Sequence, residues 1–153
     1  MEIINASSLI NVTRAVVVIL FLCCFYTTAA PAQSIVIVIN TAEENLVLSK
    51  QQVRNIYMGG ALSRKFKAIQ FQPGNPLRVD FNTKVVGLTE SRVQAYWAQM
   101  KFTGRSYPPV ELSSINEVLE YLQRVDNAVG YLPAGIDLPS NLTVIELPSN
   151  ISK

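Results

Sequence analysis

The sequence predicts an α/β domain in which helices flank a small mixed sheet. Three observations lead to this fold class. β-branched runs alternate with segments of helical periodicity from residue 33 onward. Residues 33–153 are long enough for one ordinary core, and both cysteines of the chain precede them. This length predicts a single domain over residues 33–153. Because that domain has no cysteine, apolar burial and not disulfides must stabilise it.

Residues 1–32 are expected to be a secretory signal peptide. Arg14 provides a basic flank, residues 15–26 form an apolar run, and the segment ends in the small-x-small pattern Ala30-Pro31-Ala32. We expect cleavage just before Gln33, and hence a periplasmic or secreted protein. An uncleaved membrane anchor stays open, although the run is short for a span of about 20 residues. A lipoprotein is disfavoured because neither cysteine follows a small residue.

The domain is expected to begin with a strand and a capped helix. Residues 34–40 (SIVIVIN) are a β-branched run between polar residues, which predicts a buried strand. Ser49 and Gln52 have the spacing of a capping box, in which each side chain bonds the backbone N–H of the other residue. An apolar helical face follows, and Gly59-Gly60 are expected to end the helix.

The next segment is expected to be a strand, a turn and a second helix. Residues 67–72 (KAIQFQ) alternate as a strand, and Pro73-Gly74-Asn75-Pro76 forms a turn. Asn75 is suited to cap the helix, and Pro76 suits the first helical position because no N–H is needed there. Gly87 is expected to end this helix.

The remainder is expected to add two helices and two strands. Thr89 is placed to cap a helix whose apolar stripe contains the only tryptophan of the chain, Trp97. Ser114 begins a second capping box with the glutamate three residues later. Residues 128–132 (AVGYL) and 142–147 (LTVIEL) predict short strands. The expected strands are therefore interspersed with helices along the domain.

Composition excludes several classes of function. The chain has 13 basic and 11 acidic residues and no histidine, whereas a nucleic-acid-binding domain is usually strongly basic. Without histidine, and with no cysteine after residue 32, histidine-dependent catalysis and zinc sites are excluded. We therefore expect a binding protein and not an enzyme, with no catalytic residue, no cofactor, no metal and no nucleic-acid partner.

Two further motifs have more than one interpretation. Arg64-Lys65-Phe66-Lys67 is the only local basic cluster, and a solvated loop face is favoured over a binding patch. Tyr107-Pro108-Pro109 is a stiff extended loop. It either fixes how the tryptophan helix meets the next helix, or it forms an exposed edge for protein contact.

Helix starts are the candidate ligand sites, because their unpaired N–H groups and partial positive charge suit an oxyanion. The start at Gly74-Asn75-Pro76 is favoured, since it follows a predicted strand and α/β sheets bind ligands at the carboxyl ends of strands. Arg78, one turn into the helix, is a candidate counter-charge. The alternative is a plain strand-to-helix turn with Arg78 in solvent.

Five segments stand in a characteristic order along the chain. They are Leu48–Gly60, Pro76–Phe81, Tyr96-Trp97, Phe102-Thr103-Gly104 and Ala128–Leu132. Together they resemble the phosphate-type solute-binding proteins of ABC importers, over about residues 35–133. The resemblance implies a type II periplasmic-binding-protein fold, in which two α/β lobes close over phosphate or a similar oxyanion. Residues 33–153 suffice for about one such lobe.

The resemblance also implies a ligand site. The family's phosphate loop reads Arg-x-Asp-x-Ser-Gly-Thr at a helix start, and the matching stretch here is Phe71–Leu77. Only the helix start and one capping side chain of that loop remain, so binding is expected to be weak and to use mainly backbone N–H groups. The implied ligand residues are Gly74, Asn75, Leu77 and Arg78, with Gly59 and Gly60 nearby.

Two functional hypotheses follow. The first is a periplasmic or secreted solute-binding-like protein that binds phosphate or another oxyanion and assists ABC-type uptake or sensing. The second is a ligand-free interaction module that presents its open lobe face to an envelope sensor or another partner protein. In both, the chain meets the membrane only through its signal segment.

Overall fold

The structure is a computed structural model, and it describes residues 34–43, 45–145 and 147. The predicted signal peptide over residues 1–32 and its cleavage site lie outside these residues. Within the described part of the chain, no helix is both long enough and apolar enough to cross a membrane.

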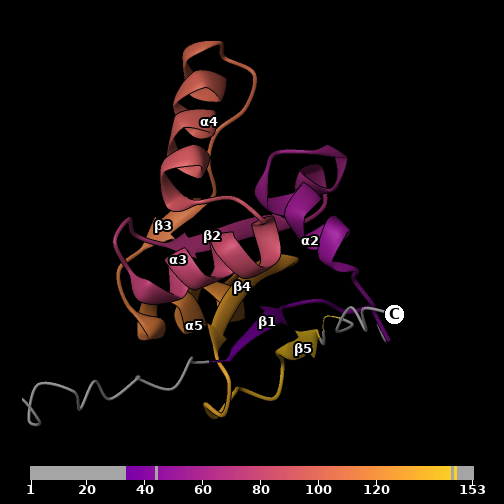
Figure 1. The fold of residues 1–153 in the computed structure, drawn as a ribbon. Helices are drawn as coiled ribbons and strands as arrows, with labels where there is room; N and C mark the ends of the chain where they lie inside the picture. Colours follow the sequence, from indigo (N-terminus) through magenta and orange to yellow (C-terminus); the bar gives the residue numbers. More distant parts are fainter. Residues whose placement is uncertain (1–33, 44, 146, 148–153) are drawn as a thin grey trace, which may run out of the picture. The chain divides into compact units, whose positions relative to one another are not determined.

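Five strands among the described residues form one mixed sheet. They are β1 (Ile35–Ile39), β2 (Lys67–Phe71), β3 (Val110–Leu112), β4 (Ala128–Pro133) and β5 (Thr143–Ile145). Their order across the sheet is β3-β2-β4-β1-β5, which can be followed in Figure 1. Strand β2 runs parallel to β3 and β4, whereas β1 runs antiparallel to β4 and β5. The predicted small mixed sheet is confirmed.

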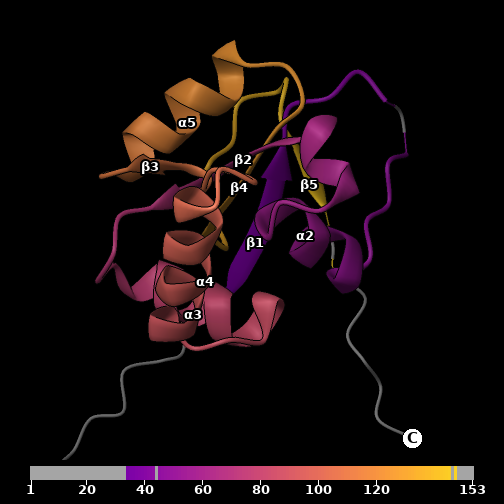
Figure 2. The same ribbon diagram turned by 90° about the horizontal axis from the view of Figure 1, so that it is seen from above.

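Helices cover both faces of this sheet. They are α2 (Lys50–Tyr57), α3 (Pro76–Phe81), α4 (Glu90–Phe102) and α5 (Ile115–Arg124), with a 3-10 helix η1 (Ala61–Arg64) and a π-helical turn η2 (Asn82–Val86). Figure 2 shows α3 and α5 on opposite sides of the strands. Phe81 of α3 stacks on Tyr131 of β4, while a side chain at Gly130 would point at Leu122 of α5. Gly130 and Tyr131 are adjacent in β4 and therefore face opposite sides of the sheet. Helices α3 and α5 thus form separate layers on its two faces.

The first two predicted helix starts are confirmed. Ser49 and Gln52 form the capping box of α2: the Gln52 N–H donates to the Ser49 hydroxyl (3.3 Å), and the Ser49 N–H donates to the Gln52 side chain (2.8 Å). Asn75 caps α3 by accepting the Leu77 N–H (2.9 Å), and Pro76 occupies the first helical position.

Three local predictions differ from the structure. The helix expected to reach Gly87 is divided into α3 and η2, although Gly87 does end it with a φ of 74°. Thr89 precedes α4, but its hydroxyl bonds no helix N–H and lies 3.2 Å from the Ser91 hydroxyl instead. Strand β3 was not predicted, because it has only three residues and follows the two prolines of a segment interpreted as a loop.

Two buried tyrosine hydroxyls join β2 to β4 where the pairing of the strands is short. The register pairs only the first two residues of each strand. Where this pairing ends, the Tyr57 hydroxyl lies between the two strands, 2.9 Å from the Ile69 carbonyl oxygen and 3.0 Å from that of Val129. The Phe71 N–H donates to the Tyr131 hydroxyl (3.2 Å). These bonds satisfy buried backbone groups and fix the end of β2 that leads into the predicted ligand turn.

Helix α4 stands away from the sheet in Figure 1. Of its predicted apolar stripe, Trp97 is buried, whereas Tyr96 and Met100 are half-buried. The Tyr96 hydroxyl donates to the carbonyl of Met58 at the end of α2 (2.7 Å), which attaches the middle of α4 to the domain. Phe102 at the far end of α4 is 93% exposed. The helix therefore presents an uncovered aromatic tip.

Candidate functional site

The predicted ligand turn lies where the sequence placed it, between the end of β2 and the start of α3. Strands β2, β3 and β4 are parallel, so their carboxyl ends share one edge of the sheet, where α/β proteins bind ligands. Gly74 has a φ of +88°, and a side chain there would meet no atom within 4 Å. Glycine is thus needed for the backbone of the turn, and the surface beside it is open.

Two N–H groups of this turn are already bonded inside it. The Asn75 N–H donates to the Gln72 carbonyl (3.2 Å), and the Leu77 N–H donates to the Asn75 side chain (2.9 Å). Pro76 between them has no N–H, and the Leu77 side chain belongs to the core. The turn therefore offers an anion fewer donors than the four of an uncapped helix start.

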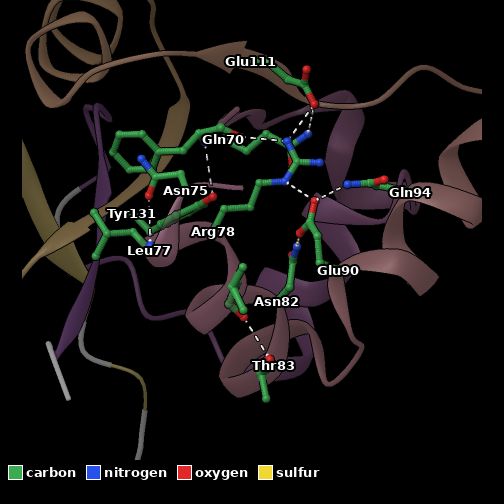
Figure 3. Close-up of polar contacts among 12 residues, drawn as sticks. Gln70, Asn75, Leu77, Arg78, Asn82, Thr83, Glu90, Gln94, Glu111 and Tyr131 are labelled. Atoms are coloured by element: carbon green, nitrogen blue, oxygen red, sulfur yellow. Dashed lines mark hydrogen bonds and ion pairs between the residues drawn. The ribbon is translucent and has the colours of Figure 1, made fainter. Parts of the chain in front are cut away.

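Arg78 is buried, with only 2% of its surface exposed. Its Nη1 donates to the Phe71 carbonyl (2.7 Å) and to Oε1 of Glu111 (2.7 Å). Its Nε lies 2.9 Å from Oε1 of Glu90, an ion pair without hydrogen-bond alignment. Figure 3 shows the guanidinium between the two carboxylates. The interpretation that placed Arg78 in solvent is therefore wrong, and its charge is balanced within the fold.

Amide side chains hold the two carboxylates in place. Glu90 accepts hydrogen bonds from the Asn82 amide (2.5 Å) and the Gln94 amide (2.9 Å), and Glu111 accepts one from the Gln70 amide (3.3 Å). We call these five residues and Arg78 the Arg78 cluster. Two carboxylates around one guanidinium leave the cluster with a net negative charge, which disfavours an anion close to it.

The buried tyrosines beside this cluster have a structural role. Burial is the largest cause that raises the pKa of both Tyr57 and Tyr131, each well above the usual value for a phenol. For Tyr131, the hydrogen bond from Phe71 and the charge of Arg78 act in the opposite direction without cancelling the effect. Both hydroxyls are therefore neutral at physiological pH, and they serve as hydrogen-bonding groups of the sheet.

Gly59 and Gly60 do not lie beside the α3 turn. They precede β2, whereas the turn follows it, and a five-residue strand spans about 16 Å. A side chain at Gly59 would come within 2.9 Å of the Ser106 hydroxyl, and one at Gly60 would overlap the side chain of Asn55. These two glycines allow close packing, and the structure does not bring them together with Gly74, Asn75, Leu77 and Arg78.

The carboxylates that bind Arg78 were not recognised from the sequence. Glu111 lies 33 residues beyond Arg78, and no local spacing relates the two. Glu90 stands in the first turn of α4, where an acidic residue is common because it complements the helix dipole. Only the parallel pairing of β3 with β2 brings Glu111 close to Arg78. The sequence could have indicated this contact only if β3 had been predicted.

Comparisons with known proteins give structural neighbours. No protein-family model matches the sequence, and no curated protein matches it. An ABC-type phosphate transport receptor from Vibrio cholerae is 15% identical, with a TM-score of 0.55, covering 75% of this chain and 46% of that one. PstS from Borrelia burgdorferi is 10% identical, with a TM-score of 0.56, covering 79% of this chain and 49% of that one.

A third neighbour was solved with its ligand. It is a phosphate ABC transporter substrate-binding protein with bound phosphate from Clostridium perfringens, 13% identical with a TM-score of 0.51, covering 75% of this chain and 45% of that one. The chain thus spans about half the length of these structures. The resemblance predicted from the sequence is confirmed as a likeness of fold: one lobe of a type II periplasmic-binding-protein architecture.

Proposed function

We propose that this protein is a non-enzymatic, solute-binding-like module of the cell envelope that acts through contact with a partner protein. It would assist uptake or sensing without capturing an oxyanion at high affinity. The observation that carries the proposal is the Arg78 cluster, in which Glu90 and Glu111 engage the cation of the predicted ligand site. An arginine held in this way adds little attraction for a free anion.

The open surface at the α3 turn supports the same proposal. A high-affinity ligand pocket encloses most of its ligand surface, whereas a side chain at Gly74 would meet no atom within 4 Å. The α3 turn therefore lacks the enclosure that high-affinity capture of an oxyanion requires.

Capture from envelope extract tests the proposal. The tagged full-length protein, produced in its own host, should retain the same specific partner in repeated purifications, with millimolar phosphate having no effect on the recovery. An unrelated envelope protein with the same tag is the control. Recovery of identical proteins by both baits would contradict the proposed role.

A second candidate function is weak binding of phosphate or a similar oxyanion at the α3 turn. It is favoured by the neighbour that contains bound phosphate and by the open surface beside Gly74. The ligand would be held mainly by backbone N–H groups around Gly74, Asn75, Leu77 and Arg78. Gly59 and Gly60 would take part only indirectly, because they lie at the other end of β2.

Isothermal titration with phosphate tests this candidate. Saturable heat in the millimolar range is expected, and Asn75→Asp should abolish it, because aspartate keeps the cap and adds a charge that repels the ligand. The control is Ser114→Asp, which makes a similar change at the start of α5. Absence of heat at millimolar phosphate, or equal effects of the two substitutions, would rule the site out.

A further inference from the structure

A pocket of about 270 Å³ opens between the end of α2, the middle of α4 and the segment that leads into β3. It lies at the opposite end of β2 from the α3 turn, because the first residues of β2 line it. Its aromatic and proline lining consists of Phe66, Trp97, Tyr107, Pro108, Pro109 and Tyr121. We call it the Trp97 pocket, and its volume suits a single ring better than a drug-sized ligand.

The strand pairing explains why the space is open. Strand β3 begins at Val110, which pairs with Ile69, so Lys67 and Ala68 have no β3 residue beside them. The two prolines before Val110 lack the N–H groups that would extend the ladder. The loop therefore runs past the start of β2 without pairing, and aromatic side chains surround the gap.

Two aromatic residues of the pocket have groups that lack a partner among the described residues: the exposed ring of Tyr107 and the buried indole N–H of Trp97. Tyr107 lines the pocket and is 72% exposed, although a large aromatic side chain gains most when it is covered. The indole N–H of Trp97 is buried and has no acceptor among the described residues, which is costly for a polar group. Both features are expected of a surface that a partner completes.

The charge around the pocket is positive. Phe66 and Lys67 line it and belong to the basic run Arg64–Lys67. Residues 60–69 contain three cationic side chains and no acidic one, and no carboxylate is present among the described residues that line the pocket. Lys65 pairs with Glu43, so Arg64 and Lys67 are the cations of this run without an ion pair among the described residues. An acidic partner segment is complementary to it.

We propose that the Trp97 pocket binds an acidic peptide segment that inserts an aromatic side chain. The ring of the inserted residue packs against Trp97 and Tyr107, and neighbouring carboxylates of the peptide approach Arg64 and Lys67. This inference rests on the proposed role in protein contact and identifies the surface that carries it. The site is separate from the α3 turn, so it does not depend on oxyanion binding.

Trp97 makes the inference measurable, because it is the only tryptophan of the chain. Tryptophan emission of the full-length protein is recorded during titration with the blocked peptide acetyl-Asp-Glu-Phe-Glu-Asp-amide. We expect a saturable change in the emission, weakened by added salt. The same peptide with alanine in place of phenylalanine should bind at least about tenfold more weakly, because it buries no ring. The lysine analogue acetyl-Lys-Lys-Phe-Lys-Lys-amide should not bind.

Matched variants separate the pocket from the rest of the surface. Tyr107→Ala should weaken the peptide about threefold to tenfold, whereas Phe102→Ala, an exposed aromatic outside the pocket, should leave the affinity unchanged. Lys67→Gln should reduce both the affinity and its salt dependence, with Lys101→Gln as its control. Circular dichroism verifies that each variant is folded.

Three results would overturn the inference: no saturable change, equal binding of the lysine analogue, or equal losses for Tyr107→Ala and Phe102→Ala. The proposed function is tested separately by capture of the native partner. If Tyr107→Ala still captures that partner at full recovery, the protein-contact role stands and the Trp97 pocket is not its surface. If nothing is captured but the peptide binds, the pocket stands without the proposed function.

Discussion

Arg78 is a buried positive charge, and its contacts determine what it contributes. A buried ion is costly unless it is paired and hydrogen-bonded. Here one carbonyl and two carboxylates compensate it. Glu111 is 41% exposed, so water screens part of that pair, whereas the Phe71 carbonyl and Glu90 lie deeper. The cluster thus joins α3, α4 and β3 through one side chain, and its loss should affect all three elements.

Replacement of Arg78 tests this structural role. Arg78→Met keeps an unbranched side chain about as long as the aliphatic stem of arginine and removes the guanidinium, which leaves Glu90 without its cation. We expect a loss of about 3 kcal/mol in the free energy of unfolding, typical of removing one partner from a buried pair. Urea denaturation followed by circular dichroism measures it.

The control for this substitution is Lys84→Met, which removes an exposed pair with Asp80 one helical turn away. Exposed pairs contribute little, so a loss under about 0.5 kcal/mol is expected. Similar losses for the two variants would show that the Arg78 cluster is screened by water as an exposed pair is.

Tyr57 carries a second residue-level prediction. Tyr57→Phe removes a hydroxyl that serves two strands, so buried carbonyl groups of Ile69 and Val129 lose a partner. The free energy of unfolding should fall by about 1–3 kcal/mol, measured by urea denaturation. Tyr107→Phe, at an exposed position, should stay within about 0.5 kcal/mol of the parent. A Tyr57→Phe protein as stable as the parent would show that the hydroxyl is dispensable.

At the scale of elements, sequence reasoning succeeded where the signal is local. The capping box at Ser49 and the Asn75-Pro76 start of α3 depend on residues two or three positions apart. Sequence reasoning failed where an element depends on residues that are far apart in the chain. Strand β3 is identified only by its pairing with β2, and the position of Arg78 depends on that pairing. The role of the candidate site was therefore not accessible from local pattern alone.

The start of α5 shows an intermediate case. Ser114 accepts the Glu117 N–H (3.2 Å) as predicted, but the Glu117 carboxylate bonds the N–H (2.8 Å) and the hydroxyl (2.6 Å) of Ser113. The second half of the expected capping box is thus displaced by one residue. These two bonds, the side-chain one first, lower the pKa of Glu117 from its ordinary value of 4.5.

A pH dependence of α5 follows. A carboxyl group with a lowered pKa in the folded state stabilises the fold above pH 4.5, and this stabilisation is lost as the pH falls through the folded pKa. Glu117→Gln should therefore lower the melting temperature at pH 7, and the difference from the parent should vanish toward pH 3. Thermal denaturation at several pH values measures it. Glu120→Gln on the same helix is the control, and an equal pH dependence for it would contradict the assignment.

At the scale of the whole domain, alternation of strands and helices was enough to predict the fold class. Apolar periodicity marks several elements independently, as in α2 and α5, so a single error such as the missing β3 did not change the predicted fold class. The predicted likeness to one lobe of a type II binding protein is confirmed by structures only 10–15% identical. Ligand specificity is not transferred at such identities, because it depends on a few side chains that the core does not constrain.

The tyrosines at the centre of the domain predict how it unfolds in alkali. Tyr57 and Tyr131 contact Phe81 and bond the two central strands, and burial raises both pKa values above the ordinary 10.0. Groups of this kind stabilise the fold fully below pH 10, and the stabilisation is lost as the pH rises toward the folded pKa. The free energy of unfolding should fall above pH 10 by about 1.4 kcal/mol per pH unit for each tyrosine.

Urea denaturation between pH 8 and pH 11.5 measures this slope, while absorbance near 295 nm reports tyrosinate. Tyr57→Phe should reduce the pH slope of the free energy of unfolding by about 1.4 kcal/mol per pH unit, the contribution of one buried tyrosine. Tyr107→Phe leaves both buried tyrosines in place and should keep their contribution to the slope. Tyrosinate from the buried pair should appear together with unfolding, because burial disfavours the charged form of both hydroxyls in the folded protein. Ionisation of all the tyrosines in a protein that stays folded would mean that water reaches the centre of the sheet.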